Sequence, residues 1–362
     1  MKYMLAARAV GVAAIVAIGG AACGSNNNSS GTTNTAATSN CGSGSLTGQG
    51  STFQQNMQKQ WTADYHTQCS HAQISYEGTG SGAGIQQFGS GTIDFAGSDV
   101  TMKPDEQSTA NSRCGGTAIT FPITAGGIAI IYNVKGLDSL NLSAKTLAGI
   151  FQGKIKKWND PQIAADNPGI TLPSTAVVSY HRADGSGTTS VFSSFEQAVA
   201  PSDWKLGSDK TVNWPAGQAA KGSDGVTAGV KATNGGITYA EVSFAKQNSL
   251  PTAKVKGTTG DFTDLTGANV SQAIDSGFTV TGTGNDVSGK LDFTKMTGYP
   301  ISTVSYAITC QKYTDAAKAK LINDYLQYVV TTGQNAADQL GFAPLPSSLA
   351  AKSKAAAASV TG

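Results

Sequence analysis

Apolar positions along the chain alternate between the spacing of amphipathic helices and the short runs of buried strands. One set recurs at every fourth residue and predicts the buried face of a helix: Phe53, Met57, Trp61 and Tyr65. Further helices are predicted at 85–88, 143–152, 189–200, 268–276 and 315–330. Strands are predicted at 45–50, 72–77, 93–96, 176–180, 236–244 (with a turn) and 301–309, and 119–133 is a long apolar run interrupted by two glycines. This alternation predicts an α/β fold.

The amino terminus has the pattern of an export signal. A positively charged start is followed by the uncharged segment 9–22, which is shorter than the roughly 20 residues that a membrane-spanning helix needs. It ends in two alanines and Cys23 and resembles a bacterial lipobox, with Gly20 where a leucine is usual. We therefore expect a signal peptide at 1–22 and lipidation of Cys23. The alternative is an ordinary secretory peptide with an incidental cysteine.

The segment that follows lacks the means to fold. Residues 24–40 contain no charged and no large apolar side chain, so they cannot bury surface. We expect 23–43 to be a flexible tether between a lipid anchor and a globular body. At the other end, 351–362 is rich in Ala, Lys and Ser and is expected to fray.

Composition limits the classes of function that the body can serve. In 362 residues, 25 Lys and Arg stand against 23 Asp and Glu, which gives a net charge of +2 and argues against a nucleic-acid partner. Charged residues make up 13%, about half the ~25% that is usual, whereas the chain has 44 glycines. This balance predicts a protein whose polar contacts are made by hydroxyl groups and backbone amides.

The cysteines and histidines predict disulfides rather than a metal site. Apart from Cys23, four cysteines remain, which suit two disulfides in an exported protein and allow three connectivities: Cys41, Cys69, Cys114 and Cys310. The sequence has no CxxC pair, and its three histidines do not share a helical spacing. We expect no bound metal.

Three turns rich in glycine and hydroxyl residues each precede a predicted helix: 48–53, 78–84 and 181–189. A helix N-terminus presents unpaired N–H groups and a partial positive charge, which suit an anion. Together the turns could surround one tetrahedral oxyanion. For each turn taken alone, the better explanation is structural, because Ser and Thr are common N-caps and glycine is common in turns.

Three charged residues sharpen this prediction. Arg182 has the planar fork that suits phosphate-like oxygens, and Asp184 could hold its guanidinium in place. Asp99 follows the predicted strand 93–96, where α/β proteins bind ligands. A carboxylate there repels an anion unless the anion carries a proton, as phosphate does near neutral pH and sulfate does not. The alternatives are a solvated arginine and an aspartate that caps a turn.

Seven short motifs carry a family resemblance: GSTF (50–53), GTGSGAG (78–84), DFAGSD (94–99), FQGKIKKWNDPQI (151–163), RADGSGTT (182–189), KGSDGV (221–226) and GYPIST (298–303). In this order, between about Leu46 and Leu349, they resemble PstS, the phosphate-binding proteins of bacterial ABC importers. The resemblance implies that Asp184 orients Arg182. It also implies a phosphate ligand set: Thr52, the Phe53 amide, Ser81, Asp99, Arg182, Ser186, Gly187 and Thr188.

The same resemblance implies a two-domain periplasmic-binding-protein fold of type II, in which the chain crosses a hinge twice between two α/β lobes. Lobe I is expected at 44–132 and 304–350 and lobe II at 133–303. In this topology Cys41 and Cys69 precede neighbouring parallel strands, which implies a bond between them. Cys114 precedes one strand and Cys310 follows an antiparallel partner, which implies the second bond, Cys114–Cys310.

The function that the resemblance implies is capture of inorganic phosphate outside the membrane and its delivery to the permease of an ABC importer. The protein would be a lipid-anchored monomer on the cell membrane, with no cofactor and no catalytic activity. The rival from another class is a secreted phosphatase or phosphoryl-transfer enzyme, with Ser186 or Thr52 as nucleophile and His181 as base. A phosphate sensor or adhesin with the same fold stays open on the sequence alone.

Overall fold

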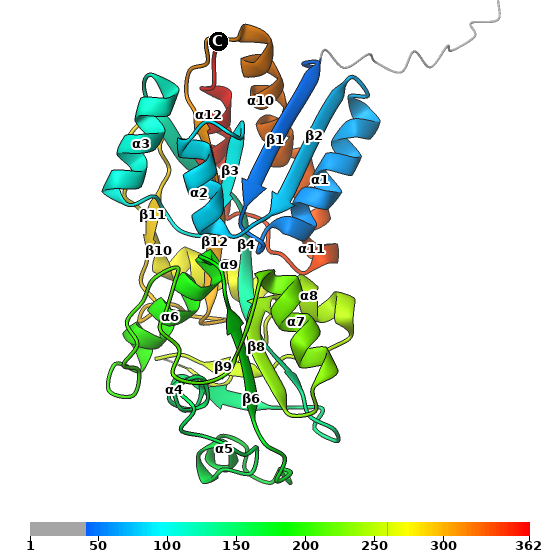
Figure 1. Ribbon diagram of the computed structural model, residues 1–362, viewed down its shortest axis with the longest axis vertical. Helices are drawn as coiled ribbons and strands as arrows, with labels where there is room; N and C mark the ends of the chain where they lie inside the picture. Colours follow the sequence, from blue (N-terminus) through cyan, green and yellow to red (C-terminus); the bar gives the residue numbers. More distant parts are fainter. Residues whose placement is uncertain (1–40, 259) are drawn as a thin grey trace, which may run out of the picture. The chain divides into compact units, whose positions relative to one another are not determined.

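The computed structural model describes residues 41–258 and 260–362. The predicted signal peptide, Cys23 and most of the predicted tether lie outside these residues. Strands and helices alternate as expected, and the α/β class is confirmed (Figure 1). The strands are β1 (Gly44–Gly50), β2 (Ala72–Gly78), β3 (Phe95–Ser98), β4 (Ala118–Asn133), β5 (Asn141–Ser143), β6 (Val178–Arg182), β7 (Gln218–Ala220), β8 (Gly236–Glu241), β9 (Lys254–Lys256), β10 (Phe278–Val280), β11 (Gly289–Leu291) and β12 (Ser302–Cys310).

Eight of these strands form one mixed sheet in the order β2-β1-β3-β12-β4-β8-β6-β7. The strands β1, β2 and β3 are parallel, so their carboxyl ends lie at one edge. The strand β12 returns antiparallel between β3 and β4. At the other end of the sheet β6 runs parallel to β8 and β7. Two separate pairs, β10–β11 and β5–β9, complete the strands of the described residues.

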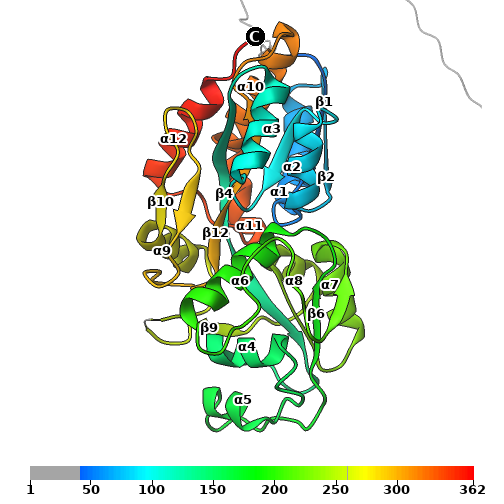
Figure 2. The same ribbon diagram turned by 60° about the vertical axis from the view of Figure 1, so that its left-hand side comes forward.

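The strand β4 links the two ends of this sheet (Figures 1 and 2). It pairs with β12 from Ala118 to Gly127 and with β8 from Ile128 to Asn133. The predicted interruption at Gly126 and Gly127 is therefore wrong. A Cβ at Gly127 would stand 2.8 Å from Leu265, so glycine at this position serves close packing rather than a break. The change of partner precedes Asn133, where the sequence placed the crossing.

The helices are α1 (Gln55–Gln68), α2 (Ser81–Gly89), α3 (Pro104–Cys114), α4 (Ala144–Phe151), α5 (Pro161–Asp166), α6 (Gly187–Val199), α7 (Gly222–Ala232), α8 (Val242–Asn248), α9 (Gly267–Gly277), α10 (Ala316–Val329), the 3-10 helix η1 (Thr332–Ala336), α11 (Ala337–Leu340) and α12 (Ser347–Ala358). The predicted stripe on α1 is buried, and Trp61 donates from Nε1 to Gly333 O (2.8 Å). Sequence reasoning missed α3, which has a single buried residue, Ala110, and so lacks an apolar stripe.

The carboxyl-terminal tail is ordered, which corrects the prediction of a frayed end at 351–362. It forms most of α12, and Ala356 and Ala357 are fully buried. Asn323 on α10 holds the end of this helix, since its Nδ2 donates to Ala357 O (3.2 Å) and to Val360 O (2.9 Å). Alanine contributes little to an apolar stripe in the sequence, but its small side chain permits close helix packing.

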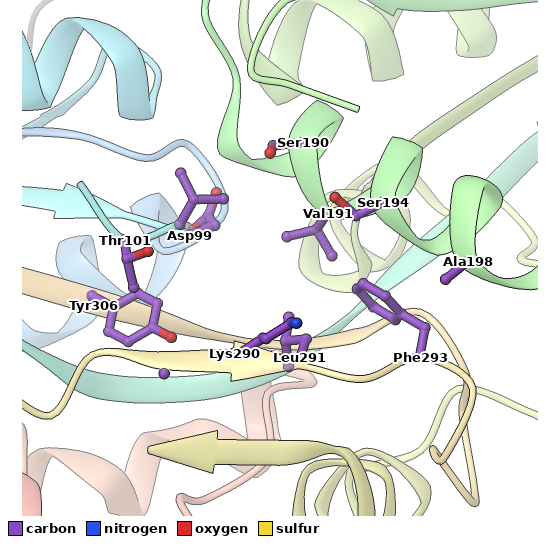
Figure 3. A pocket seen from close by; sticks show the side chains of 12 residues that line it. Asp99, Thr101, Ser190, Val191, Ser194, Ala198, Lys290, Leu291, Phe293 and Tyr306 are labelled. Carbon is purple, nitrogen blue, oxygen red and sulfur yellow. The ribbon is translucent and has the colours of Figure 1, made fainter. Parts of the chain in front are cut away.

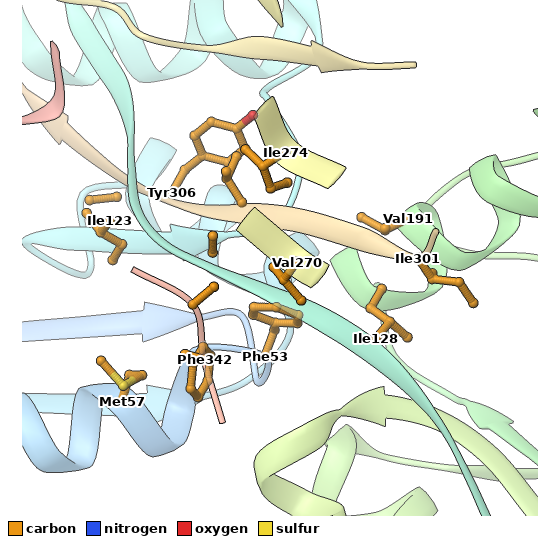
Figure 4. Packing of buried hydrophobic residues seen from close by; sticks show 14 of the residues in the cluster. Phe53, Met57, Ile123, Ile128, Val191, Val270, Ile274, Ile301, Tyr306 and Phe342 are labelled. Carbon is orange, nitrogen blue, oxygen red and sulfur yellow. The ribbon is translucent and has the colours of Figure 1, made fainter. Parts of the chain in front are cut away.

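A continuous apolar core underlies the strands and joins the elements around β4 (Figure 4). Phe53, at the start of α1, packs edge-on against Phe342 with ring centroids 5.7 Å apart. The hairpin β10–β11 also lies against β4, because Val287 N donates to Thr120 O (2.7 Å). This hairpin belongs to the range 133–303, which the sequence assigned to lobe II.

Both expected disulfides are present. Cys41 bonds to Cys69 and Cys114 bonds to Cys310. The register explains both bonds. The start of β1 lies beside the start of β2 in parallel, and Ala118 at the start of β4 lies opposite Cys310 at the end of β12.

Candidate functional site

The three glycine-rich turns meet at one place. The first turn joins β1 to α1 and the second joins β2 to α2, at the shared carboxyl edge of parallel strands. The third turn joins β6 to α6 and faces them, because Gly82 N donates to Gly185 O (2.8 Å). A Cβ placed on Gly187 would stand 2.3 Å from Ser81 Oγ and 2.6 Å from Asp99 Oδ2. The predicted residues from turns far apart in sequence are thus brought together.

Burial excludes the solvated alternative for the charged members of this site. Arg182 is 5% exposed and Asp99 is 2% exposed. The hydroxyl residues predicted from the turns are equally buried: Thr52, Ser81, Ser186 and Thr188. A buried arginine is strongly destabilising unless an opposite charge pairs with it.

Asp184 holds Arg182 as predicted. Arg182 Nε donates to Asp184 Oδ1 (2.8 Å), and Arg182 Nη2 pairs with Oδ2 of the same carboxylate. Gly222 N, at the start of α7, also donates to Asp184 Oδ1 (2.9 Å). Burial acts to raise the pKa of Asp184, but the hydrogen bonds and charge of Arg182 outweigh it and hold this pKa below its usual value. The guanidinium is therefore fixed by two of its three nitrogens.

Asp99 is held by hydroxyl groups that sequence reasoning missed. Its Oδ1 accepts from Ser51 Oγ (2.5 Å) and Ser305 Oγ (2.6 Å), and its Oδ2 lies 3.4 Å from Ser81 Oγ. Burial raises the pKa of Asp99, and the hydroxyl donors together with the charge of Arg182 oppose this rise. Ser51 lies within the motif GSTF, whereas Ser305 lies in β12 outside every motif that the sequence analysis identified.

Capping explains one of the three turns. Ser186 is the N-cap of α6, since its Oγ accepts from Thr189 N (3.1 Å). The N-cap residues of α1 and α2 make no side-chain capping bond. The hydroxyl groups of the first two turns therefore need another explanation than helix capping.

The remaining predicted ligands differ in whether they already have a hydrogen-bond partner within the protein. Thr52 Oγ1 lies 2.8 Å from Ser223 Oγ, and Phe53 N donates to Ser51 Oγ (3.0 Å). Thr188 Oγ1 is buried and has no hydrogen-bond partner among residues 41–258 and 260–362. An orphaned buried hydroxyl aimed from the first turn of α6 is a group that a ligand could satisfy.

Two ion pairs tie the loop that follows α6 to the start of α3, and this loop contacts the third turn. Lys210 pairs with Glu106, and Lys103 Nζ lies 2.8 Å from Asp209 Oδ2. The carbonyl oxygen of Lys210 accepts from Ser186 N (2.9 Å). The hydrogen bond from Lys103 lowers the pKa of Asp209 and raises that of Lys103. The position of Ser186 thus depends on contacts that reach across to α3.

A cavity of about 330 Å³ lies beside Asp99 (Figure 3). Its lining includes Thr101 from the loop before α3, Ser190 from α6 and Lys290 from β11. Asp99 therefore borders this space on one side and the glycine-rich turns on the other.

His181, the candidate base of the rival enzyme, is engaged elsewhere. Its ring stacks on Trp214 with centroids 5.1 Å apart, and Nδ1 lies 3.4 Å from the carbonyl oxygen of Arg182. Burial lowers the pKa of His181. Within the described part of the chain, no group of three or more His, Cys, Asp and Glu side chains is arranged to hold a metal ion. No helix in that part is long and apolar enough to cross a bilayer.

Comparison with known proteins identifies the family. A family model described as a PBP superfamily domain matches residues 35–332. Phosphate-binding protein PstS 3 of Mycobacterium leprae is 38% identical over 346 residues, covering 92% of this chain and 93% of the relative. Phosphate-binding protein PstS of Xylella fastidiosa is 33% identical, and the match covers 84% of this chain and 82% of the relative. The chain belongs to the PstS family.

Solved structures agree with the PstS assignment at the level of the fold. A high-affinity periplasmic phosphate-binding protein with bound phosphate matches at a TM-score of 0.70 and 24% identity, over 86% of this chain and 93% of that one. A human phosphate-binding apolipoprotein matches at a TM-score of 0.66 and 26% identity, over 84% of this chain and 92% of that one. These matches confirm the periplasmic-binding-protein fold. PstS relatives are named as binding proteins, which supports a solute-binding protein over the rival enzyme.

Proposed function

We propose that this PstS protein captures inorganic phosphate between its glycine-rich turns and delivers it to the permease of an ABC importer. One observation carries the proposal: a buried arginine and a buried carboxylate face the same turns. Arg182 supplies positive charge for an oxyanion, whereas Asp99 is suited to an anion that still carries a proton. Phosphate near neutral pH meets both conditions.

Two members of the proposed ligand set are groups that the fold leaves available. Asp184 occupies Nε and Nη2 of Arg182, which leaves Nη1 for a phosphate oxygen. The Thr188 hydroxyl is a second available donor. The other proposed ligands are those expected from the motifs: Thr52, Ser81, Ser186, Gly187 and the Phe53 amide, which would exchange its bond to Ser51 Oγ for one to phosphate. The α6 N-terminus adds its partial charge.

Closure of two lobes around phosphate is the proposed mechanism of capture. The partner change of β4 between Gly127 and Ile128 supports a hinge at this point, some residues before Asn133. The packing of β10–β11 on β4 supports grouping this hairpin with the first lobe. Closing the lobes excludes water and strengthens each hydrogen bond to the anion.

The cellular setting is proposed from the amino-terminal sequence and the relatives. A signal peptide at 1–22, a lipidated Cys23 and a tether at 23–43 would hold a monomer at the outer side of the cell membrane. The family name PstS and a periplasmic neighbour of the same fold support an extracytoplasmic binding protein. Mass spectrometry of the membrane fraction would detect diacylglycerol on Cys23, and a cleaved, unmodified terminus would contradict the anchor.

Calorimetric titration with phosphate, sulfate and arsenate tests the proposed function. We expect one phosphate per chain, competition by arsenate, which is also tetrahedral and protonated, and exclusion of sulfate. A parallel assay with p-nitrophenyl phosphate should show no turnover. Sustained turnover that is lost in Ser186→Ala would favour the phosphoryl-transfer enzyme instead.

A further inference from the structure

The two hydroxyl groups that donate to Asp99 are each oriented by a donor behind them. Ser51 Oγ accepts from the N–H of Phe53 (3.0 Å) while it lies 2.5 Å from Asp99 Oδ1. Ser305 Oγ accepts from Gln54 Nε2 (2.8 Å) while it lies 2.6 Å from the same carboxylate oxygen. A hydroxyl has one proton. Ser305 Oγ also lies 3.3 Å from Ser98 O, farther than the 2.6 Å to Asp99 Oδ1. An ionised carboxylate can only accept, so the short contacts direct both protons to Asp99 Oδ1.

The orientation of the Gln54 amide is fixed by a backbone carbonyl. Gln54 Nε2 also donates to Tyr306 O (3.1 Å), and a carbonyl oxygen can only accept. The amide nitrogen of Gln54 therefore faces Ser305 and Tyr306, and its oxygen faces Gln58. Gln58 Nε2 donates to that oxygen (2.7 Å), and Tyr325 OH donates to Gln58 Oε1 (2.7 Å). Every donor in this series points the same way.

These contacts form one buried chain of donors, which we name the Asp99 relay: Tyr325, Gln58, Gln54, Ser305 and Asp99. Its members come from α10, α1, β12 and the end of β3, and each is at most 2% exposed. The relay ends on Oδ1, which also accepts from Ser51 of the first turn, so Oδ2 is the oxygen directed toward Ser81 and Gly187. A Cβ on Gly187 would stand 2.6 Å from this oxygen.

We propose that the Asp99 relay sets the ligand specificity of the site by keeping Asp99 an acceptor toward the bound oxyanion. Two O–H donors on Oδ1 stabilise the ionised carboxylate, which then accepts a hydrogen bond from the O–H of a protonated ligand and repels a fully deprotonated one. The proposal rests on the proposed function, and in it Gln54 and Ser305 are positioning residues that act through Asp99. Nothing in the local sequence around Ser305 indicates this role.

Loss of one donor has a defined chemical consequence. Burial already raises the pKa of Asp99, and the hydrogen bonds from Ser305, Ser51 and Ser81 together with the charge of Arg182 oppose that rise. The phenols of Tyr76 on β2 and Tyr306 on β12 are further titratable groups that interact with Asp99. Without the Ser305 hydroxyl, the carboxyl group takes up a proton more readily as the pH falls. A protonated Asp99 donates rather than accepts, so sulfate becomes a competent ligand and phosphate loses its advantage.

The experiment compares phosphate and sulfate affinities by calorimetry from acidic to weakly basic pH. In Ser305→Ala the phosphate-over-sulfate ratio should fall about tenfold or more, the order of one hydrogen bond to a charged group, and should fall further as the pH is lowered. Ser305→Thr keeps the hydroxyl and should restore the wild-type ratio and pH profile. Gln54→Glu keeps the Ser305 hydroxyl but redirects its proton away from Asp99, so it should reproduce the Ser305→Ala profile.

Thr303→Val is the matched control. Thr303 lies two residues before Ser305 on β12 and is fully buried, and its hydroxyl donates to Val304 O (3.0 Å) rather than to the relay. The Thr303→Val variant should be less stable than the wild type but should have the same ratio of phosphate to sulfate affinity. A wild-type ratio at every pH in both Ser305→Ala and Gln54→Glu would overturn the relay; if Ser305→Ala does not fold, Gln54→Glu alone decides. Failure of the wild-type protein to bind phosphate would instead overturn the proposed function.

Discussion

Gly187 lies against Asp99 so closely that a Cβ at position 187 would stand 2.6 Å from Asp99 Oδ2. The two residues are 88 positions apart and belong to the third turn and to the end of β3. The same Cβ would stand 2.3 Å from Ser81 Oγ. A Cβ atom does not approach non-bonded atoms this closely in proteins, so this junction requires glycine.

Gly187→Ala should therefore weaken phosphate binding while the protein still folds. The added methyl group forces apart the turns that carry Ser81 and Asp99, and overpacking of this kind costs about 1–3 kcal/mol. We expect phosphate affinity to fall by about tenfold to hundredfold in calorimetry. Gly185→Ala is the control, because its Cβ would meet Gly82 Cα at an ordinary 3.5 Å. Equal affinities in the two variants would contradict the close junction.

The two disulfides should differ in their contribution to stability. Cys114–Cys310 closes a sequence separation of 196 residues, against 28 for Cys41–Cys69. In the chain-entropy description a longer loop restricts the unfolded state more, here by about 2 kcal/mol. Replacing Cys114 and Cys310 by alanine should thus lower the free energy of unfolding more than replacing Cys41 and Cys69. Denaturant titration measures both losses, and the reverse order would be a contradiction.

Glu241 should make the stability of the protein depend on pH. It is fully buried beside the change of partner in β4, with Ser243 N donating to its Oε2 (2.8 Å), and burial raises its pKa from 4.5 to about 8. The folded state then keeps a proton that the unfolded state has lost. The free energy of unfolding should be highest below pH 4.5 as far as this group is concerned. It should fall by up to about 1.4 kcal/mol per pH unit as the pH rises toward about 8.

Glu241→Gln keeps the shape of the side chain and cannot ionise, so the slope should flatten in thermal or denaturant unfolding over this range. Glu196 is also fully buried, and burial raises its pKa as well. In the double variant Glu241→Gln/Glu196→Gln, the free energy of unfolding should therefore depend on pH even less. A slope in Glu241→Gln that matches the wild type would show that Glu241 does not retain its proton.

The sequence allowed prediction of those parts of the site that lie within short motifs. The turns at 48–53, 78–84 and 181–189 each combine glycine with hydroxyls, and Arg182 stands two residues before Asp184. Ser305 could not be found this way, because it reaches Asp99 through the pairing of β12 with β3 rather than through neighbours in the chain. Its role depends on the tertiary fold.

The helices and strands likewise divide into those that the sequence pattern predicts and those that it does not. The stripe on α1 and the apolar strands follow from periodicity. In contrast, α3 has almost no buried face, and its start is held by Lys103 N, which donates to Glu106 Oε2 (2.8 Å). The tail is ordered because Asn323 holds the end of α12, a contact between segments that no local pattern predicts. Periodicity identifies elements that bury an apolar face, and it misses elements held by caps and distant polar contacts.

The central claim is that Asp99 makes the site selective for a protonated oxyanion. The most direct test is the ratio of phosphate to sulfate affinity in the wild type and in Asp99→Asn, with Asp184→Asn as control. The asparagine amide can donate to sulfate, so the ratio should fall by about a hundredfold or more in Asp99→Asn. Asp184→Asn loosens Arg182 and should weaken both anions alike. A wild-type ratio in Asp99→Asn, or equal binding of sulfate and phosphate by the wild-type protein, would contradict the account.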